Sequence, residues 1–571
     1  MPADTTPLPT PSPHPASAPG TSLSLLSFLK PFHRPSPAIP PTVPLVVRVG
    51  FAGSRTMFDL SQHPDLDAGD LMAQVSDALM DRLRELRAAL GLSPHHFLCG
   101  VSQIAVGADT LFTRACQTLG IAQRVLLPQE REDYLAAVGT EGPDFTPEEE
   151  QVARGLLGSP HIIEECVVSH ARDRSARFEE TNTAILEDSD IVICLVREAA
   201  GSRRGGTEDL ISQAEALGKP VTRITVAIKE GKVQLSPLKP LKEWLNGSDF
   251  ALPSAPRELS GLVIAAPGPA NAWPTAESFI AQIKGRASEL SKKHSGWFKR
   301  SAIIIISFHL GATVVAILAG KLHETIVPIF LSSEFLLLVA GLAAHFRLHR
   351  GAHARVWAVN RLVAETMRSL AEVERLRGDV TYPLELPVPD GLVPLLRTSA
   401  VLHLRRDRSG EDSTWTARRD AYIERRLTGL KGGQLAYYET QTRKAELSLK
   451  VATWLFRVFS SLAIVAAVAE LLLQFNRLPA ALVEPTDNWG NTLAVFMPVA
   501  AVGFLSWAAA SDLEARAQTF AEMHAFLERQ LRRLNAAGSE RGFSRLVRET
   551  ESRLLGENLN WFWRRSFTSV T

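Results

Sequence analysis

The first half of the chain alternates short apolar runs with amphipathic segments. Five runs have the length and aliphatic content of buried strands, and they lie at 45–49, 97–101, 124–127, 190–196 and 219–226. Between the first two runs, apolar residues recur at helical spacing from Leu71 to Leu90. Strands that alternate with helices predict an α/β domain with a parallel sheet and helices on both faces. The stretch 129–185 is longer than one crossover needs, so we expect a helical insertion there.

The second half carries four long apolar segments, which predict an all-α region with four transmembrane helices. The segments are 302–320, 326–344, 454–475 and 492–510. Each is close to the roughly 20 residues that a helix needs to cross the hydrocarbon core of a bilayer. Short connections join the segments within each pair, so we expect two hairpins in contact with the lipid bilayer.

Three ionisable residues interrupt these spans: His309, Glu334 and Glu470. An ionisable group is costly in hydrocarbon and usually faces the interior of a helix bundle or a pore. We expect this inward position for Glu334, which lies near the middle of its span. Glu470 lies near the end of its span and could instead extend toward the membrane surface. Glu334 could also pair with His309 within one subunit and only hold the bundle together.

The basic residues that flank the spans predict the orientation of the protein. Lysines and arginines cluster at 292–300, 347–355 and 443–450, whereas the two loops inside the hairpins hold only Lys321 and Arg477. Because basic segments stay on the cytoplasmic side, both termini should be cytosolic in a multi-pass protein of the inner (cytoplasmic) membrane. An amphipathic pattern follows each hairpin, which suggests duplication and a surface for homo-oligomer formation.

Composition narrows the possible partners. The chain has 62 basic and 61 acidic residues, so no bulk charge indicates nucleic acid. Its four cysteines form no CxxC pair and lie near no set of histidines, so no metal site is predicted. Residues 1–42 are rich in proline and poor in apolar residues, and this composition predicts a disordered tail rather than a signal peptide.

These patterns divide the chain into seven segments. They are a disordered proline-rich tail (1–42), an α/β domain (43–270), a connector (271–300), a first two-span hairpin with its cytosolic helix (301–380), a basic cytosolic linker (381–425), a second two-span hairpin with its cytosolic helix (426–540) and a C-terminal cytosolic segment (541–571).

Three glycine-containing turns follow predicted strands of the α/β domain. They contain Gly53, Ser54 and Arg55; Gly107, Ala108 and Asp109; and Gly205, Gly206, Thr207 and Glu208. Ligands of open α/β sheets bind at the carboxyl ends of the strands, where these turns should meet. A glycine allows close approach of the backbone to a phosphate, a helix N-terminus favours an anion, and an arginine offers a charged fork. The pattern therefore predicts a nucleotide-binding crevice.

This part of the chain resembles a known superfamily. The run from Val49 to Arg55, the run from Ala105 to Asp109, Tyr134 after a Leu-Pro pair, and Gly205 to Thr207 are similar to motifs of the SLOG superfamily. SLOG domains are Rossmann-like and include phosphoribohydrolases that activate cytokinins. The resemblance covers about 45–230 and implies a nucleotide or a nucleotide-derived ligand. The hydrolase branch has a proline-led turn and a glutamate three residues after its threonine, whereas here Glu208 follows Thr207 directly.

The membrane half resembles a second family. Arg426, Gln434, Tyr437, Tyr438 and Ala445, ahead of a span, are similar to the helix that leads into the membrane in SLATT domains. SLATT domains are two-span effectors found beside such sensors in bacterial conflict systems. The resemblance covers about 415–535 and implies that a sensor triggers pore formation or membrane disruption.

Three functions remain open from the sequence. The first is a membrane effector that is controlled by a nucleotide or nucleotide-derived signal, with a role in bacterial conflict such as defence against phage. The second is a membrane-tethered hydrolase of a nucleotide N-glycosidic bond, for which Asp109 and Glu208 are the candidate catalytic residues. The third is a scaffold with a vestigial pocket. The first is favoured because four spans with polar interior residues exceed what an anchor needs, and no cofactor other than the nucleotide ligand is expected.

Overall fold

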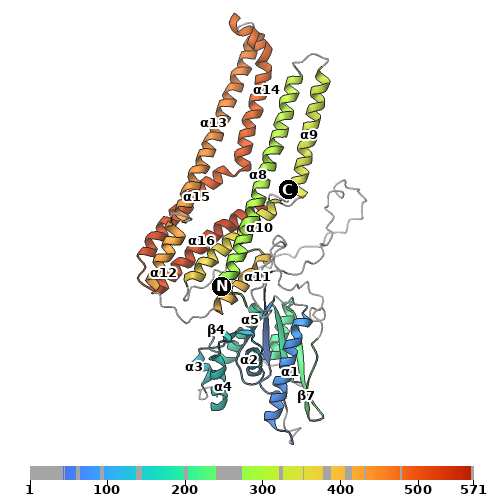
Figure 1. The fold of residues 1–571 in the computed structure, drawn as a ribbon, viewed down its shortest axis with the longest axis vertical. Coiled ribbons are helices and arrows are strands. Elements are labelled where there is room, and N and C mark those ends of the chain that lie inside the picture. The colour runs from blue at the N-terminus through green and yellow to red at the C-terminus, as the bar shows by residue number, and fades with distance from the viewer. Residues whose placement is uncertain are drawn as a thin grey trace, which may run out of the picture. The chain divides into compact units, whose positions relative to one another are not determined.

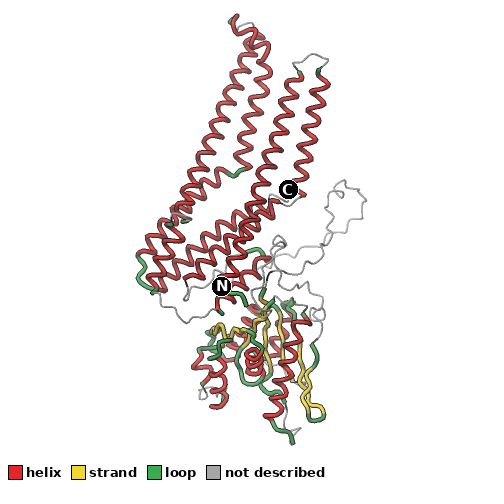
Figure 2. Tube along the Cα trace, in the orientation of Figure 1, coloured by secondary structure: helices red, strands yellow, loops and turns green. Residues whose placement is uncertain are grey.

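The computed structural model describes residues 43, 45–58, 65–90, 96–136, 145–197, 204–238, 273–320, 326–350, 353–376, 388–405, 414–429, 433–475 and 479–567. The proline-rich tail predicted at 1–42 lies outside these residues. Within them, a seven-stranded sheet with its helices comes first, and long helices follow (Figures 1 and 2). This order confirms the predicted α/β domain and the all-helical region after it.

The sheet is mostly parallel. Its strands are β1 (Val46–Gly53), β2 (Phe97–Ser102), β3 (Ala122–Leu127), β4 (Ile162–Val167), β5 (Ile191–Arg197), β6 (Val221–Lys229) and β7 (Lys232–Leu235). They lie in the order β4-β3-β2-β1-β5-β6-β7, and only the β6–β7 pair is antiparallel. The register pairs Val46 with Phe97 across β1 and β2, and Val49 with Ile191 across β1 and β5. The first strand therefore lies at the centre of the sheet.

Three details of the sheet differ from the sequence-based expectation, and one of them is β7, which none of the five predicted runs includes. The apolar pattern predicts a turn from Gly50, whereas β1 continues to Gly53. Gly50 is needed inside the strand because a Cβ at this position would lie 2.3 Å from the Ser189 hydroxyl oxygen. The stretch predicted as a helical insertion also contains β4. This strand was missed because Glu164 and Glu165 interrupt its apolar pattern.

Helices cover both faces of the sheet. They are α1 (Ala68–Ala89), α2 (Ala108–Thr118), α3 (Arg131–Leu135), α4 (Pro147–Leu157), α5 (Arg174–Asp188) and α6 (Thr207–Ala216). Leu79 of α1 and Phe112 of α2 share one buried cluster with Phe51 of β1, whose ring stacks on Phe112. Ile185 of α5 and Leu210 of α6 lie in a separate cluster on the other side of the sheet. Alternate residues of the strands supply these two cores.

The helical region begins with a continuous helix that joins the predicted connector to the first span. That helix is α8 (Ala276–Ala319). The other elements of the helical region are α9 (Val327–Arg350), α10 (His353–Leu376), η4 (Asp390–Leu392), α11 (Val393–Leu404), α12 (Trp415–Tyr422), the π-helical η5 (Ile423–Thr428), α13 (Gln434–Gln474), α14 (Ala480–Ala510), α15 (Leu513–Asn535) and α16 (Glu540–Phe567). The apolar pattern predicts the fourth span from residue 492, whereas α14 already begins at Ala480. Pro479 is its N-cap, and the alanines that follow favour helix.

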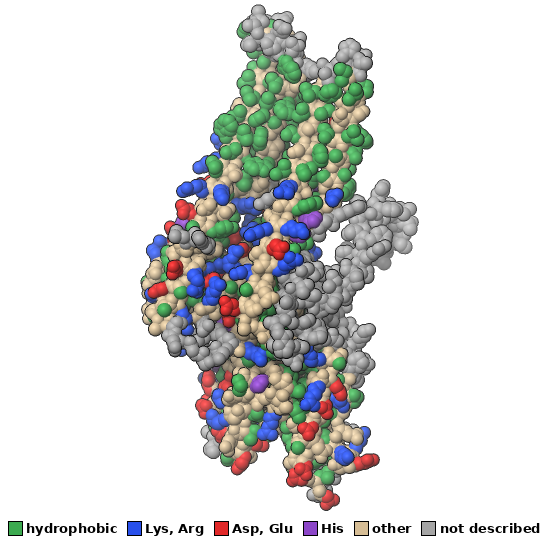
Figure 3. Space-filling model, viewed as in Figure 1, with side chains coloured by type: hydrophobic (Ala, Val, Ile, Leu, Met, Phe, Trp, Pro, Cys, Tyr) green, Lys and Arg blue, Asp and Glu red, His purple; other side chains and the backbone are tan. Residues whose placement is uncertain are grey.

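Four helical stretches of the described chain are long and apolar enough to cross a membrane, and they cover the predicted spans except for at most one residue at an end. Figure 1 shows α8 beside α9 and α13 beside α14, as their contacts require. Large apolar side chains of these helices are exposed, among them Leu336, Ile464 and Val502 at 66%, 65% and 59%. Figure 3 shows such side chains gathered along the four helices. An apolar surface of this extent is typical of contact with lipid.

Outside the spans, the helices share one large core. Phe279 of α8, Met367 of α10, Leu527 of α15 and Val547 of α16 all lie in the same buried cluster. At its centre the carboxylate of Glu551 accepts hydrogen bonds from four groups on three other elements. The donors are Arg426 Nε and Nη2 at 2.9 and 2.7 Å, the Tyr422 hydroxyl at 2.7 Å and the Ser369 hydroxyl at 2.8 Å.

Helix α11 contacts the amino ends of the strands. The Thr398 hydroxyl accepts a hydrogen bond from the Val46 N–H at 3.0 Å. Arg397 donates to Asp190 at 2.9 Å, and Asp190 also accepts from the Arg48 backbone N–H at 2.8 Å. Strands β1 and β5 are thus held by α11 at one end, and their carboxyl ends are left for the site.

Candidate functional site

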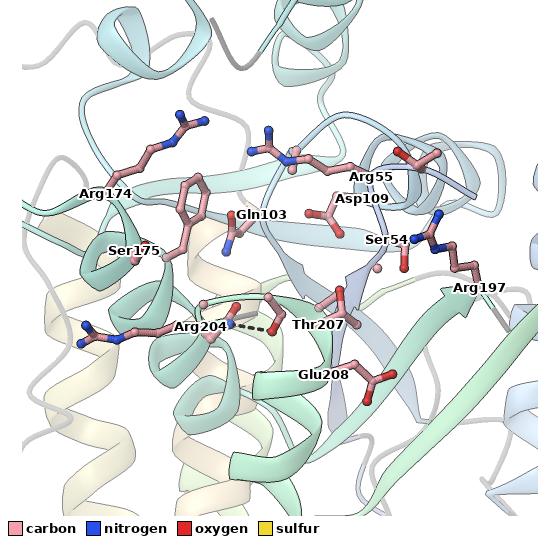
Figure 4. Close-up of a pocket in the computed structure, with 18 residues that line it drawn as sticks. Ser54, Arg55, Gln103, Asp109, Arg174, Ser175, Arg197, Arg204, Thr207 and Glu208 are labelled. Carbon is pink, nitrogen blue, oxygen red and sulfur yellow. Dashed lines mark hydrogen bonds between the residues drawn. The ribbon is translucent and has the colours of Figure 1, made fainter. Parts of the chain in front are cut away.

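The strand order creates a crevice at the carboxyl ends of β1 and β5. The chain passes from β1 to β2 on one side and places β5 on the other side of β1. Crossovers leave these two strands toward opposite faces of the sheet, and ligands of open α/β sheets bind at such a switch point. A cavity of about 320 Å³ lies here (Figure 4). This volume is at the lower end of the roughly 300–1,000 Å³ of small-molecule sites.

Most of the predicted site residues line this cavity. Gly53, Ser54, Arg55, Asp109, Gly205, Gly206, Thr207 and Glu208 are among its lining residues. They come from the end of β1 and the turn after it, from the turn before α6, and from the first turns of α2 and α6. The Asn182 side chain of α5 donates to the Gly206 carbonyl at 3.3 Å and holds the third turn against α5 (Figure 4). The structure therefore brings the three turns together.

Gly107 and Ala108 do not line the cavity but shape its wall. Gly107 has a φ of +94°, and a Cβ there would lie 2.3 Å from the Arg55 carbonyl oxygen. A Cβ at Gly53 would lie 2.1 Å from the Ala108 Cβ. These glycines thus allow the first two turns to pack against each other. The sequence predicted instead that glycine lets the backbone approach a phosphate.

Asp109 is the most perturbed carboxyl group of the cavity. It is 6% exposed, and its Oδ1 has no hydrogen-bond partner among the residues that the structure describes. Burial raises the pKa of Asp109 to about 7, although the backbone amide of Ala105, the charge of Arg55 and the amide of Gly53 favour the ionised form. At neutral pH this group can therefore either accept or donate a proton. The Glu208 carboxylate, which also lines the cavity, pairs with Arg223 at 2.9 Å.

Sequence reasoning missed several polar residues of the cavity. Arg174 and Ser175 lie at the start of α5, Arg197 ends β5, and Arg204 precedes the third turn. In Figure 4 Arg174 and Arg55 extend along the same side of the cavity, and Arg197 lies near Ser54. Arg204 instead pairs with Glu179 at 2.6 Å. The signal for Arg197 was its place directly after an apolar strand, whereas nothing local marked Arg174.

The three polar residues of the spans form no ion pair with one another in the described part of the chain. His309 on α8 faces α9, since a Cβ at Gly341 would lie 3.3 Å from the His309 Nε2. Glu334 is half-buried, and within the described chain it forms no ion pair with His309. Glu470 is also half-buried, and its buried Oε2 forms no hydrogen bond with any described residue. An inward-facing role of these groups stays a prediction.

The fold and the spans define a class of protein: a membrane protein with a Rossmann-like α/β domain and four transmembrane helices. Residues 422–561 match the family model of the SMODS and SLOG-associating 2TM effector domain 1. The match confirms the SLATT resemblance, and it extends from Tyr422 through α13, α14 and α15 into α16. Comparison with curated proteins and with solved structures gives no match. The SLOG resemblance of the first domain stays a prediction.

Proposed function

We propose that this protein is a membrane effector controlled by a nucleotide or a nucleotide-derived signal. The signal binds in the cavity of the α/β domain and triggers a pore or membrane disruption by the spans. The observation that carries the proposal is the convergence of three glycine turns and several arginines at a switch point, in a chain that also matches a two-span effector domain. The name of that domain places such effectors beside SLOG sensors, which favours a role in bacterial conflict, including defence against phage.

The groups that line the cavity suit a phosphate-bearing ligand with a ring. Arg55, Arg174 and Arg197 offer guanidinium groups that bind phosphate in a bidentate manner. The first turn of α6 adds backbone N–H groups at a helix N-terminus behind Gly206. Phe178 provides an apolar face beside Arg55, whose guanidinium carbon lies 5.7 Å from the ring centroid. Asp109 could accept a hydrogen bond from a ribose hydroxyl.

The spans and their flanks support the output side of the proposal. The effector acts in the cytoplasmic membrane with both termini in the cytosol, because the basic residues flank the cytosolic ends of both hairpins. A homo-oligomer would arrange the spans of several subunits around one shared pore. A ligand drives such a change only through a difference in affinity between two states.

A second candidate function rests on Asp109. A carboxyl group with a pKa of about 7 in a cavity is suited to general acid–base catalysis. Asp109 could then protonate the leaving base of a nucleotide in a membrane-tethered hydrolase. Glu208 is less suited to this role because Arg223 already pairs with it.

The experiment is the identification of the native ligand. The full chain, purified in detergent from its own host, is denatured and the released molecules are analysed by mass spectrometry. We expect a nucleotide-derived compound in near-stoichiometric amount. Arg55→Ala should remove charge-assisted hydrogen bonds worth about 1.5–3 kcal/mol and lower the recovered amount about tenfold or more. Arg114→Ala, at an exposed position of α2 outside the cavity, is the matched control.

Two outcomes separate the alternatives. Recovery of the intact ligand favours the effector, whereas turnover of added nucleotide that stops with Asp109→Asn favours the hydrolase. Equal recovery from Arg55→Ala and from the parent protein would exclude this cavity as the binding site.

A further inference from the structure

A second cavity lies in the cytosolic helical core, far along the chain from the α/β domain. Its volume is about 380 Å³, and α10, η5, α13 and α16 line it. The lining residues of η5, α13 and α16 fall within residues 422–561, whereas α10 follows the first hairpin. A molecule in this cavity would therefore touch the helices that extend from both pairs of spans. The function proposed above uses none of its residues.

The cavity is lined by hydrogen-bond donors that the protein leaves uncommitted. Arg426 is 5% exposed and binds Glu551 through Nε and Nη2, and its Nη1 has no partner among the described residues. Arg361 lies over the Trp561 ring, 4.3 Å from its centroid, and has no carboxylate at ion-pair distance in the described part of the chain. A buried cation with free N–H groups is stabilised by an anion.

Neutral donors complete the wall. Gln434 is 8% exposed, and neither its side-chain amide nor the Tyr437 hydroxyl forms a hydrogen bond with another described residue. These two side chains lie about one helical turn apart on α13 and line the same cavity as Arg361 and Arg426. Four separate donor groups thus surround a space that is large enough for a small molecule.

The two carboxylates that line the cavity do not cancel its preference for an anion. Glu365 is already neutralised by Arg368, whose Nη1 lies 2.6 and 2.8 Å from the two carboxylate oxygens. Burial raises the pKa of Glu557, although the nearby Arg361 favours its ionised form. When it is protonated, the Glu557 carboxyl group donates a hydrogen bond to an anion and does not repel it.

The position of the cavity favours a soluble ligand over a lipid headgroup. Tyr438 of its wall precedes Trp454, at the start of the apolar stretch, by roughly 24 Å of helix at 1.5 Å per residue. The headgroup layer on each side of a bilayer is only about 5–8 Å thick. The cavity thus opens to the cytosol rather than to the membrane surface.

We propose that the cavity bounded by Arg361, Arg426 and Tyr437 is a second ligand site, which binds a small soluble molecule through a phosphate or a similar oxyanion group. The site is independent of the cavity in the α/β domain. It would allow a second cytosolic anion to act on both hairpins at once.

The test measures binding of radiolabelled inorganic phosphate to the full chain in detergent by equilibrium dialysis. All proteins carry Arg55→Ala, which weakens any phosphate binding in the α/β domain. We expect about one bound phosphate per chain, at least about tenfold weaker affinity with Arg361→Gln, and weaker binding with Tyr437→Phe. Arg375→Gln is the matched control, because Arg375 lies on the same helix, pairs with Glu372 at 2.7 Å and does not line the cavity.

The outcomes distinguish this site from the function proposed above. If Arg361→Gln abolishes phosphate binding without changing the melting temperature, the second site is supported. This result does not depend on whether Arg55→Ala affects a ligand in the cavity of the α/β domain. Saturable binding that Arg361→Gln and Tyr437→Phe leave unchanged would overturn it. Absence of saturable binding at millimolar phosphate, at both pH 6 and pH 8, would also overturn it, because the cavity would then hold only water.

Discussion

The substitution Glu551→Ala should strongly destabilise the helical core outside the spans. Glu551 is 0% exposed, and its two oxygens accept four hydrogen bonds from Arg426, Tyr422 and Ser369. The substitution leaves the Arg426 charge buried without a carboxylate, which costs about 3–5 kcal/mol. For a region of this size, each kcal/mol shifts the melting temperature by about 2–4 °C. The expected fall is therefore roughly 6–20 °C.

The assay is the apparent melting temperature of the full chain in detergent, followed by helical circular dichroism. Glu549→Ala is the matched control, two residues earlier on α16. Glu549 pairs with Arg533 at 2.8 Å, but the two side chains are 42% and 48% exposed. An exposed pair contributes about 0–1 kcal/mol, so the control should melt within a few degrees of the parent. Equal shifts for both variants would refute the central role of the buried carboxylate.

Three further predictions concern the α/β domain, its contact with α11 and the orientation of the chain. The pKa of Asp109 is raised from 3.8 to about 7 in the folded state. Asp109 therefore destabilises the folded α/β domain increasingly as the pH rises from about 4 through 7. Asp109→Asn should therefore raise the melting temperature more at pH 8 than at pH 5, and equal shifts at both would contradict this. Thr398→Val should leave the buried Val46 N–H without an acceptor and cost about 1–3 kcal/mol in chemical unfolding. Thr366→Val, which removes a buried hydroxyl that has no partner within the described ranges, should be neutral or stabilising. Reporter fusions at the C-terminus and near residue 408 should be cytoplasmic and one at residue 477 external, and an external C-terminus would exclude the proposed topology.

The sequence predicted those features that depend on local periodicity and turn chemistry. The strands with continuous apolar runs and the four spans were found because burial on both sides, or in lipid, requires uninterrupted apolar residues. β4 was missed because it lies at the edge of the sheet, where Glu164 and Glu165 are compatible with a strand that pairs on one side only. The early start of α14 was missed because the length and hydropathy of an apolar segment do not determine where its helix begins.

Part of the site could not be predicted because it depends on tertiary packing. The turns at Gly53, Asp109 and Gly205 follow strands, and topology alone brings the ends of these strands together. Arg174 and Phe178 reach the cavity only because α5 packs beside the third turn, where Asn182 binds the Gly206 carbonyl. The second cavity likewise joins α10 to α16 across a long separation in the chain. No local pattern carries that information.

The most direct test of the central claim is leakage of a trapped dye and of ions from liposomes that contain the purified full chain. The account predicts that the vesicles stay sealed without the native ligand and leak when it is added to the side of the α/β domain. Leakage should be lost with Arg55→Ala, persist with Arg114→Ala, and change in rate or ion preference with Glu334→Gln. Vesicles that stay sealed while the ligand is bound, or that leak equally without it, would contradict the account.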